Sequence, residues 1–162
     1  MPPVTSEPPV WLTPEQSEAW LAVIYGIRAL LRGLDDQLQR DADMTHAAYA
    51  VLVRLSNASD HTMPMGELAA ETRYSPSALS HLIRRLEERG WVKRWLDAND
   101  KRRMFAMMTA EGVAALRDAA PGHVAFVRDV VFSNLNEREV RLLTKTFRAM
   151  SGRLAEIASA VD

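Results

Sequence analysis

Cysteine is absent from this 162-residue sequence. Its absence excludes disulfide bonds, thiolate catalysis and cysteine-ligated zinc, and it is typical of a protein from a reducing compartment. Long apolar runs are absent as well: no stretch approaches the roughly 18 residues that a membrane span needs, so we expect no membrane association. Glycine-rich phosphate loops and the histidine spacings of zinc sites are also missing. We therefore expect no enzyme, no cofactor and no metal site.

The N-terminus is rich in proline, with four prolines among the first nine residues. It contains neither a basic segment nor an apolar segment, so it does not read as a secretory signal, and we expect a cytoplasmic protein. Hydrophobic residues make up 48% of the chain and charged residues 25%, which fits a single globular domain with a substantial core. The net charge is only −1, so any contact with nucleic acid must be local.

Positive charge is concentrated in residues 73–103. Nine Lys or Arg and four Asp or Glu fall in this segment, a balance of +5, which leaves −6 for the rest of the chain. Ser75 followed by Pro76 predicts the start of a helix here, and Gly90 predicts its end. A basic helix on an otherwise acidic chain has the charge distribution of a protein that reads duplex DNA.

The predicted helix has two different faces. Leucine and isoleucine recur at positions 79, 82, 83 and 86, a spacing that predicts one buried stripe. The remaining surface offers candidate DNA contacts, which are Ser75, Ser77, Ser80, His81, Arg84 and Arg85, with Arg73 flanking them. Arginine can pair bidentately with guanine in the major groove, while serine and histidine make shorter polar contacts. The alternative is a solvated amphipathic face without a partner.

Residues 91–96 and 103–108 predict two strands that follow this helix and form a hairpin. Its loop offers a second set of candidate DNA contacts, which are Asp100, Lys101, Arg102 and Arg103. A narrow minor groove attracts an inserted arginine, and Asp100 can hold Arg102 extended by a charge-assisted hydrogen bond. The alternative is an ordinary polar turn with solvated charges.

Long amphipathic helices are predicted at both ends of the chain. The first begins at Pro14 after the cap residue Thr13, and its apolar residues follow a heptad spacing: Trp20, Ile24, Ile27, Leu31, Leu34 and Leu38. A helix of about 26 residues exceeds what one small domain needs, so we expect part of its apolar face to meet another chain. The last helix begins after the cap residue Asn136, and its apolar face continues to Ile157.

The elements between these helices predict a helix-turn-helix with a β wing. A helix is expected over residues 46–57, a loop over 58–64, a short helix over 65–72 and a fifth helix over 110–133, which Pro121-Gly122 should kink or split. The expected fold is mainly α with a small β-hairpin wing. It divides into an arm (1–12), a dimerisation helix (13–44), a winged helix-turn-helix lobe (45–109) and C-terminal dimerisation helices (110–162).

Five short motifs in this order resemble the MarR family of winged helix-turn-helix transcriptional regulators. They are Met44-Thr45 with Tyr49 and Val51-Leu52, Gly66-Glu67-Leu68-Ala69, Ser77 to Ser80 continuing to Val92, Asp100 to Arg103, and Thr109 to Gly112. The match covers about residues 13–158. The resemblance implies a homodimer, joined through the first and last helices, that binds a palindromic operator in double-stranded DNA. It also implies a repressor that releases DNA when a small phenolic or aromatic ligand binds.

The resemblance places the effector pocket between the dimer helices and the DNA-binding lobe. Trp20, Tyr25, His46 and Tyr49 are candidate lining residues, although packing in the core also explains each of them. Two other functions stay open: a winged-helix module that docks on an acidic protein, and an activator that needs no effector.

Overall fold

The computed structural model describes residues 10–160, so the proline-rich arm lies outside the described residues except for its last three positions. The chain divides into two compact units, one ending at Gly33 and the other beginning at Leu34, and each is described by itself. Helix α1 (Pro14–Ala42) supplies the described part of the first unit and enters the second. The four-part division expected from the sequence stays a prediction.

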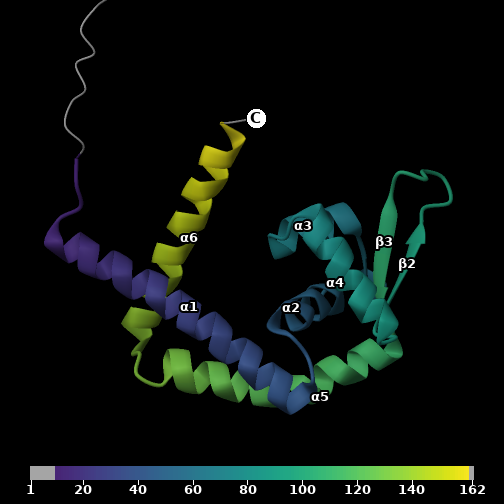
Figure 1. Ribbon diagram of the computed structural model, residues 1–162, viewed down its shortest axis with the longest axis horizontal. Helices are drawn as coiled ribbons and strands as arrows, with labels where there is room; N and C mark the ends of the chain where they lie inside the picture. Colours follow the sequence, from purple (N-terminus) through teal and green to yellow (C-terminus); the bar gives the residue numbers. More distant parts are fainter. Residues whose placement is uncertain (1–9, 161–162) are drawn as a thin grey trace, which may run out of the picture. The chain divides into compact units, whose positions relative to one another are not determined.

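The second unit contains every later element (Figure 1). These are α2 (His46–Ser56), a 3-10 turn (Ser59–His61), β1 (Thr62–Pro64), α3 (Met65–Thr72), α4 (Pro76–Glu88), β2 (Val92–Leu96), β3 (Met104–Met108), α5 (Ala110–Val127), the π-helical turn η2 (Arg128–Phe132) and α6 (Glu137–Ser159). The expected fold class, mainly α with a small β wing, is confirmed. No helix within residues 10–160 is both long enough and apolar enough to cross a membrane.

The polar residues that predicted helix starts do cap them. The Ser75 hydroxyl accepts a hydrogen bond from the backbone N–H of Ala78 at 3.2 Å. Asn136 and Glu139 form a reciprocal capping box at the start of α6. Each cap satisfies an N–H group that has no partner inside its own helix, which explains why these boundaries are visible in the sequence.

The sheet contains one strand that the sequence did not predict. Its three strands are antiparallel in the order β1-β3-β2, and Met63 of β1 pairs with Ala106 of β3. The prediction of a loop over residues 58–64 is therefore wrong for its last three residues. Three residues are too few to show the alternation of a strand, and pairing with β3 rather than local preference forms β1.

Helix α5 runs through Pro121 as one element, so of the predicted kink or split at Pro121-Gly122 the split is wrong, and the kink stays a prediction. Pro121 lies on the exposed side of α5, where the carbonyl that loses its helical partner can bond to water. The end of α1 passes close to Gly122, where a Cβ would lie 3.4 Å from Nε2 of Gln37, an ordinary van der Waals contact. The hydrogen-bonding pattern of the helix changes only after Val127, at the π-helical turn η2.

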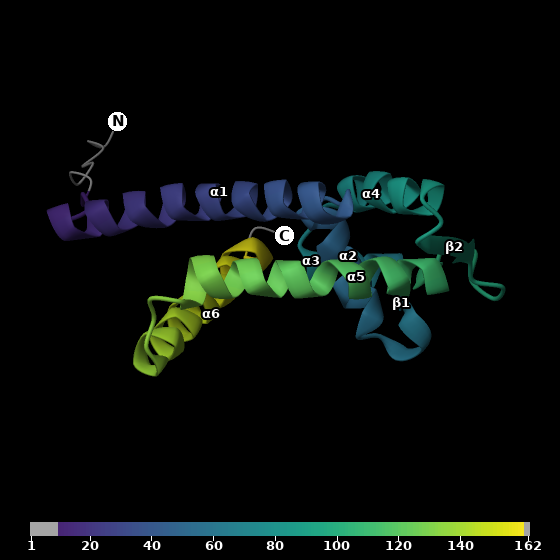
Figure 2. The ribbon, with the colours of Figure 1, turned by 90° about the horizontal axis from the view of Figure 1, so that it is seen from below.

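Helix α2 packs against α3, α4, α5 and β3 in the centre of the second unit. The fully buried large side chains of this core are Leu38, Met44, Val51, Leu52, Leu55, Leu68, Leu79, Ile83, Leu86 and Val92. The predicted apolar stripe of α4 thus faces inward, and its polar side faces outward. The core positions the β2–β3 hairpin, or wing, so that it begins at the end of α4 and its tip stands clear of the helices (Figures 1 and 2).

We expect Gly112→Ala to destabilise this unit by about 1–3 kcal/mol, the range for overpacked cores. A Cβ at Gly112 would lie 2.3 Å from the backbone oxygen of Trp91 and 2.7 Å from Cγ of Met108, so the backbone must shift. Urea unfolding measures the loss. Gly66→Ala is the matched control, because a Cβ there meets nothing within 4 Å; equal losses in both variants would contradict the close approach.

Candidate nucleic-acid interface

The outward face of α4 gathers the central residues that the sequence predicted. Ser77, Ser80, His81 and Arg84 are all exposed. Arg84 runs along the helix: its Nη2 lies 3.4 Å from Nδ1 of His81 and its Nε lies 3.9 Å from a carboxylate oxygen of Glu88. Exposed contacts this long contribute little energy, so the guanidinium can exchange them for a new partner.

The other predicted residues of this helix flank that face. The Ser75 hydroxyl caps α4 and lies 3.2 Å from the Ser77 hydroxyl. Arg85 is exposed on the side of α4 that faces the start of α2, where it borders a small cavity. Arg73 is exposed at the end of α3, with a left-handed φ of 60°. These three residues therefore border the central surface rather than form it.

The wing holds Arg102 in a defined position. Both the backbone N–H and Nε of Arg102 donate to Oδ1 of Asp100 at 3.1 Å. These hydrogen bonds, the side-chain bond first, lower the pKa of Asp100, so its carboxylate stays charged. The Arg102 side chain is nevertheless 92% exposed. Asp100 thus orients this guanidinium without covering it, as the Asp-x-Arg spacing predicted.

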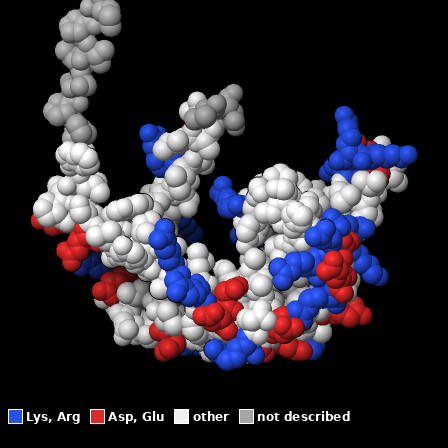
Figure 3. Space-filling model, viewed as in Figure 1, with Lys and Arg blue, Asp and Glu red and all other residues white. Residues whose placement is uncertain are grey.

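Two arginines of the basic segment form ion pairs that join separate elements of the fold. Arg94 binds Glu87 through Nε at 2.8 Å and Nη2 at 2.5 Å, and its backbone N–H also donates to that carboxylate. Arg89 forms an ion pair with Asp43 at 3.1 Å. Seven exposed cations of the segment remain: Arg84 and Arg85 on α4, Lys101, Arg102 and Arg103 at the wing tip, Arg73 after α3 and Lys93 on β2. Figure 3 shows basic side chains gathered at the wing tip and below it. Two of the nine basic residues thus pair with a carboxylate from another element, and the other seven are exposed.

The four candidate effector residues fall in different places. Trp20 and Tyr25 lie on α1 before Leu34 and are 52% and 63% exposed. Tyr49 is buried and His46 is half-buried, both on α2. The ring of Tyr49 lies 4.2 Å from that of His123, and the ring of His46 lies 6.0 Å from it.

His123 of α5 is the member of this cluster that the sequence did not single out. No spacing pattern connects it to Tyr49, because only the packing of α5 on α2 brings the two together. Two buried polar atoms, Nδ1 of His123 and Oε1 of Gln37, have no hydrogen-bond partner among the described residues. Buried polar atoms are rarely left without a partner, so these two atoms distinguish the contact between α5, α2 and the end of α1 from the apolar core.

We expect the stability of the second unit to fall as the pH drops below about 6.5, the ordinary value for histidine. Burial lowers the pKa of His46 against a smaller effect of Asp35, and burial followed by the charge of His46 lowers the pKa of His123. The unfolded chain then binds more protons than the folded one, so protonation favours unfolding. Urea unfolding between pH 7.5 and 5.5 measures this slope.

The double variant His46→Asn/His123→Gln should flatten that pH dependence. Tyr49→Phe is the control: it keeps the ring next to His123 but removes a group that does not titrate in this range, so it should preserve the slope. An unchanged slope in the double variant would show that other groups cause the pH dependence.

A family model described as the MarR family matches residues 42–103. The fold is similar to that of Sco3205 from Streptomyces coelicolor, a MarR family transcriptional regulator solved in complex with DNA, with a TM-score of 0.86, 41% identity, and coverage of 88% of this chain and 90% of that one. AbsC, a MarR family regulator from the same organism, gives a TM-score of 0.87 at 33% identity and covers 91% of this chain and 99% of that one.

A curated relative, the transcriptional repressor YetL of Bacillus subtilis, is 27% identical over 112 residues. That match covers 69% of this chain and 66% of YetL, slightly less than two thirds of the relative. The two Streptomyces structures align with nearly the whole chain, and the family model falls on the helix-turn-helix and wing. The chain therefore belongs to the MarR family of winged-helix, DNA-binding transcriptional regulators.

Proposed function

We propose that this protein is a homodimeric repressor that binds a palindromic operator through α4 and the wing. One observation carries the proposal: α4 turns Ser77, His81 and Arg84 outward, while Asp100 holds Arg102 exposed at the wing tip. The α4 side chains have the chemistry to read base edges in the major groove, and Arg102 suits the negative potential of an adjacent minor groove. The similarity to YetL, a transcriptional repressor, supports repression rather than activation.

The uncovered apolar faces of the end helices support the dimer. No residue of α6 is buried, although its apolar stripe includes Phe147, Met150, Leu154 and Ile157, which are 38–66% exposed. On α1, Trp20 and Leu31 are also about half exposed. A long helix with an uncovered apolar stripe normally packs against another chain, and a second copy gives a self-complementary interface.

A dimer explains why the operator would be palindromic. Two copies of α4 related by a two-fold axis must enter successive major grooves on one side of the duplex, about 34 Å apart. A small aromatic effector would act by favouring a different spacing, and it can shift the equilibrium only by its difference in affinity for the two forms. The aromatic cluster of Tyr49 and His123, with its unpartnered Nδ1, supports a ligand that carries both a ring and a hydrogen-bonding group.

Selection of binding sites from random duplex DNA tests this proposal. We expect a consensus of two inverted half-sites whose centres lie about one helical turn apart, and binding that weakens steeply with salt. Binding that is salt-sensitive but shows no sequence preference would contradict operator recognition. No binding to DNA, together with binding to an acidic protein, would favour the interaction module instead.

A further inference from the structure

Helix α1 ends in a strained conformation at Asp43. The backbone N–H of Asp43 bonds to the Gln39 carbonyl at 3.1 Å, and that of Met44 reaches back to the Leu38 carbonyl at 3.2 Å. This pattern places Asp43 at the position that usually carries glycine, and its φ is 46°. Glycine adopts this region without strain, whereas aspartate does so at a cost, so the contacts of the Asp43 side chain are of interest.

The Asp43 side chain has two partners. One carboxylate oxygen accepts a hydrogen bond from Nε2 of Gln39 at 2.7 Å, and the other lies 3.1 Å from Nη2 of Arg89. Nη1 of Arg89 also donates to the backbone carbonyl of Asp43. Arg89 therefore binds both the side chain and the main chain of one residue, and we call this the Asp43–Arg89 clamp.

Arg89 is itself fixed at the end of α4. It is the last residue before Gly90, whose φ is 73°, and the backbone N–H of Trp91 bonds to the Leu86 carbonyl at 2.9 Å. The guanidinium carbon lies 3.9 Å from the centre of the Trp91 ring, a cation–π arrangement. The clamp thus joins two helix ends whose backbones are both locked by left-handed caps.

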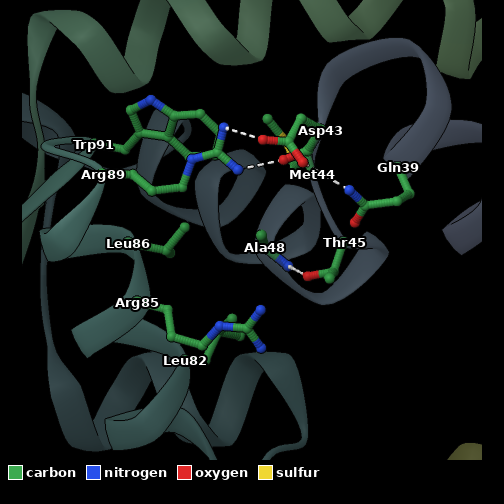
Figure 4. Close-up of a pocket in the computed structure, with 10 residues that line it drawn as sticks. All are labelled: Gln39, Asp43, Met44, Thr45, Ala48, Leu82, Arg85, Leu86, Arg89 and Trp91. Atoms are coloured by element: carbon green, nitrogen blue, oxygen red, sulfur yellow. Dashed lines mark hydrogen bonds and ion pairs between the residues drawn. The ribbon is translucent and has the colours of Figure 1, made fainter.

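The clamp lies beside a cavity. This cavity of about 150 Å³ is lined by the end of α1, the start of α2 and α4. Its lining includes Ala48, Leu82 and Leu86, and Figure 4 shows the guanidinium of Arg89 reaching Asp43 at its edge. Beside this cavity the guanidinium of Arg89 bridges the end of α1 and the end of α4, held by both the side chain and the main chain of Asp43.

We propose that the Asp43–Arg89 clamp positions α4 relative to the end of α1 and so sets the half-site spacing that the dimer accepts. This inference rests on the proposed function, because spacing matters only to a protein that binds two half-sites. Neither residue needs to touch DNA. They act through α4, because they hold the orientation of its outward face.

Asp43→Gly is the most discriminating variant, because glycine adopts the left-handed conformation without strain while the carboxylate is lost. We expect a melting temperature equal to or above that of the wild type. We also expect operator affinity to fall about tenfold, and the preference for the selected spacing over spacings one base pair longer or shorter to fall about tenfold. Asn also tolerates the left-handed conformation and keeps a side-chain oxygen. Asp43→Asn should therefore retain most of the operator affinity and most of the spacing preference.

The direction of the change separates positioning from direct contact. If Arg89 bound phosphate, Asp43→Gly would free it and strengthen binding at every spacing, and that result would overturn the proposal. An unchanged spacing profile in Asp43→Gly, with any change in melting temperature, would also overturn it. A wild-type protein that shows no preference for spacing would remove the proposed function itself and the clamp's role with it.

Discussion

Glutamate at both Phe147 and Leu154 should convert the protein to a monomer and lower operator affinity by roughly 100-fold or more, the usual gain from linking two binding modules. Both residues lie on the apolar stripe of α6 and are 40% and 66% exposed in one chain. In a two-fold interface each substitution occurs twice, so four carboxylates would be buried without partners, each at a cost of several kcal/mol. Sedimentation velocity and fluorescence anisotropy on the selected operator measure the two effects.

Ala149→Glu is the matched control for that experiment. It lies roughly 200° around α6 from Phe147, outside the stripe, and is exposed. It should leave both the oligomeric state and the operator affinity close to wild type. A double variant that stays dimeric, or a monomer that binds the full operator as tightly as the wild type, would contradict the role of α6.

Arg102→Ala should weaken operator binding by about 100-fold, or about 2.7 kcal/mol, because each of two wings loses about a factor of ten. Arg102 is the wing residue that combines near-complete exposure with a fixed orientation. Its loss should also reduce the salt dependence by about one unit for each wing. Anisotropy titrations over a range of salt concentrations give both quantities.

Two further variants show whether position or charge causes that loss. Arg117→Ala removes an equal charge from α5, where Arg117 pairs within residues 10–160 only with its neighbour Asp118 at 3.0 Å, and it should leave binding nearly unchanged. Asp100→Ala makes the wing more positive yet removes the oxygen that accepts both hydrogen bonds of Arg102. If orientation matters, Asp100→Ala weakens specific binding. Stronger specific binding would mean that the wing contributes charge alone.

Local signals were enough to predict most of the fold that positions the interface. The apolar spacing of α4 and the Ser75-Pro76 start predicted its buried stripe and its exposed face. The Asp-x-Arg spacing predicted the bond between Asp100 and Arg102, because residues two apart in a tight loop meet regardless of the rest of the fold. These features depend on neighbours in sequence, so the sequence alone reveals them.

Features that depend on distant partners could not be predicted. Strand β1 exists because β3 pairs with it, and α5 continues through Pro121 because that residue faces solvent. In the sequence Arg89 is one more cation of a basic segment, but in the fold it pairs with Asp43, 46 residues away. The sequence identified where positive charge gathers, and tertiary contacts decide which arginines are free to meet DNA.

Base preference at each operator position is the most direct test of the account. Affinities of the wild type, Arg84→Ala and Arg102→Ala should be measured on every single-base variant of the selected operator. The account predicts that Arg84→Ala loses discrimination at the same position of both half-sites, worth about 1–3 kcal/mol each, and keeps it elsewhere. Arg102→Ala should instead weaken binding at the flanks. A uniform loss across all sequences for Arg84→Ala would show that α4 contacts phosphate and would contradict base readout by this helix.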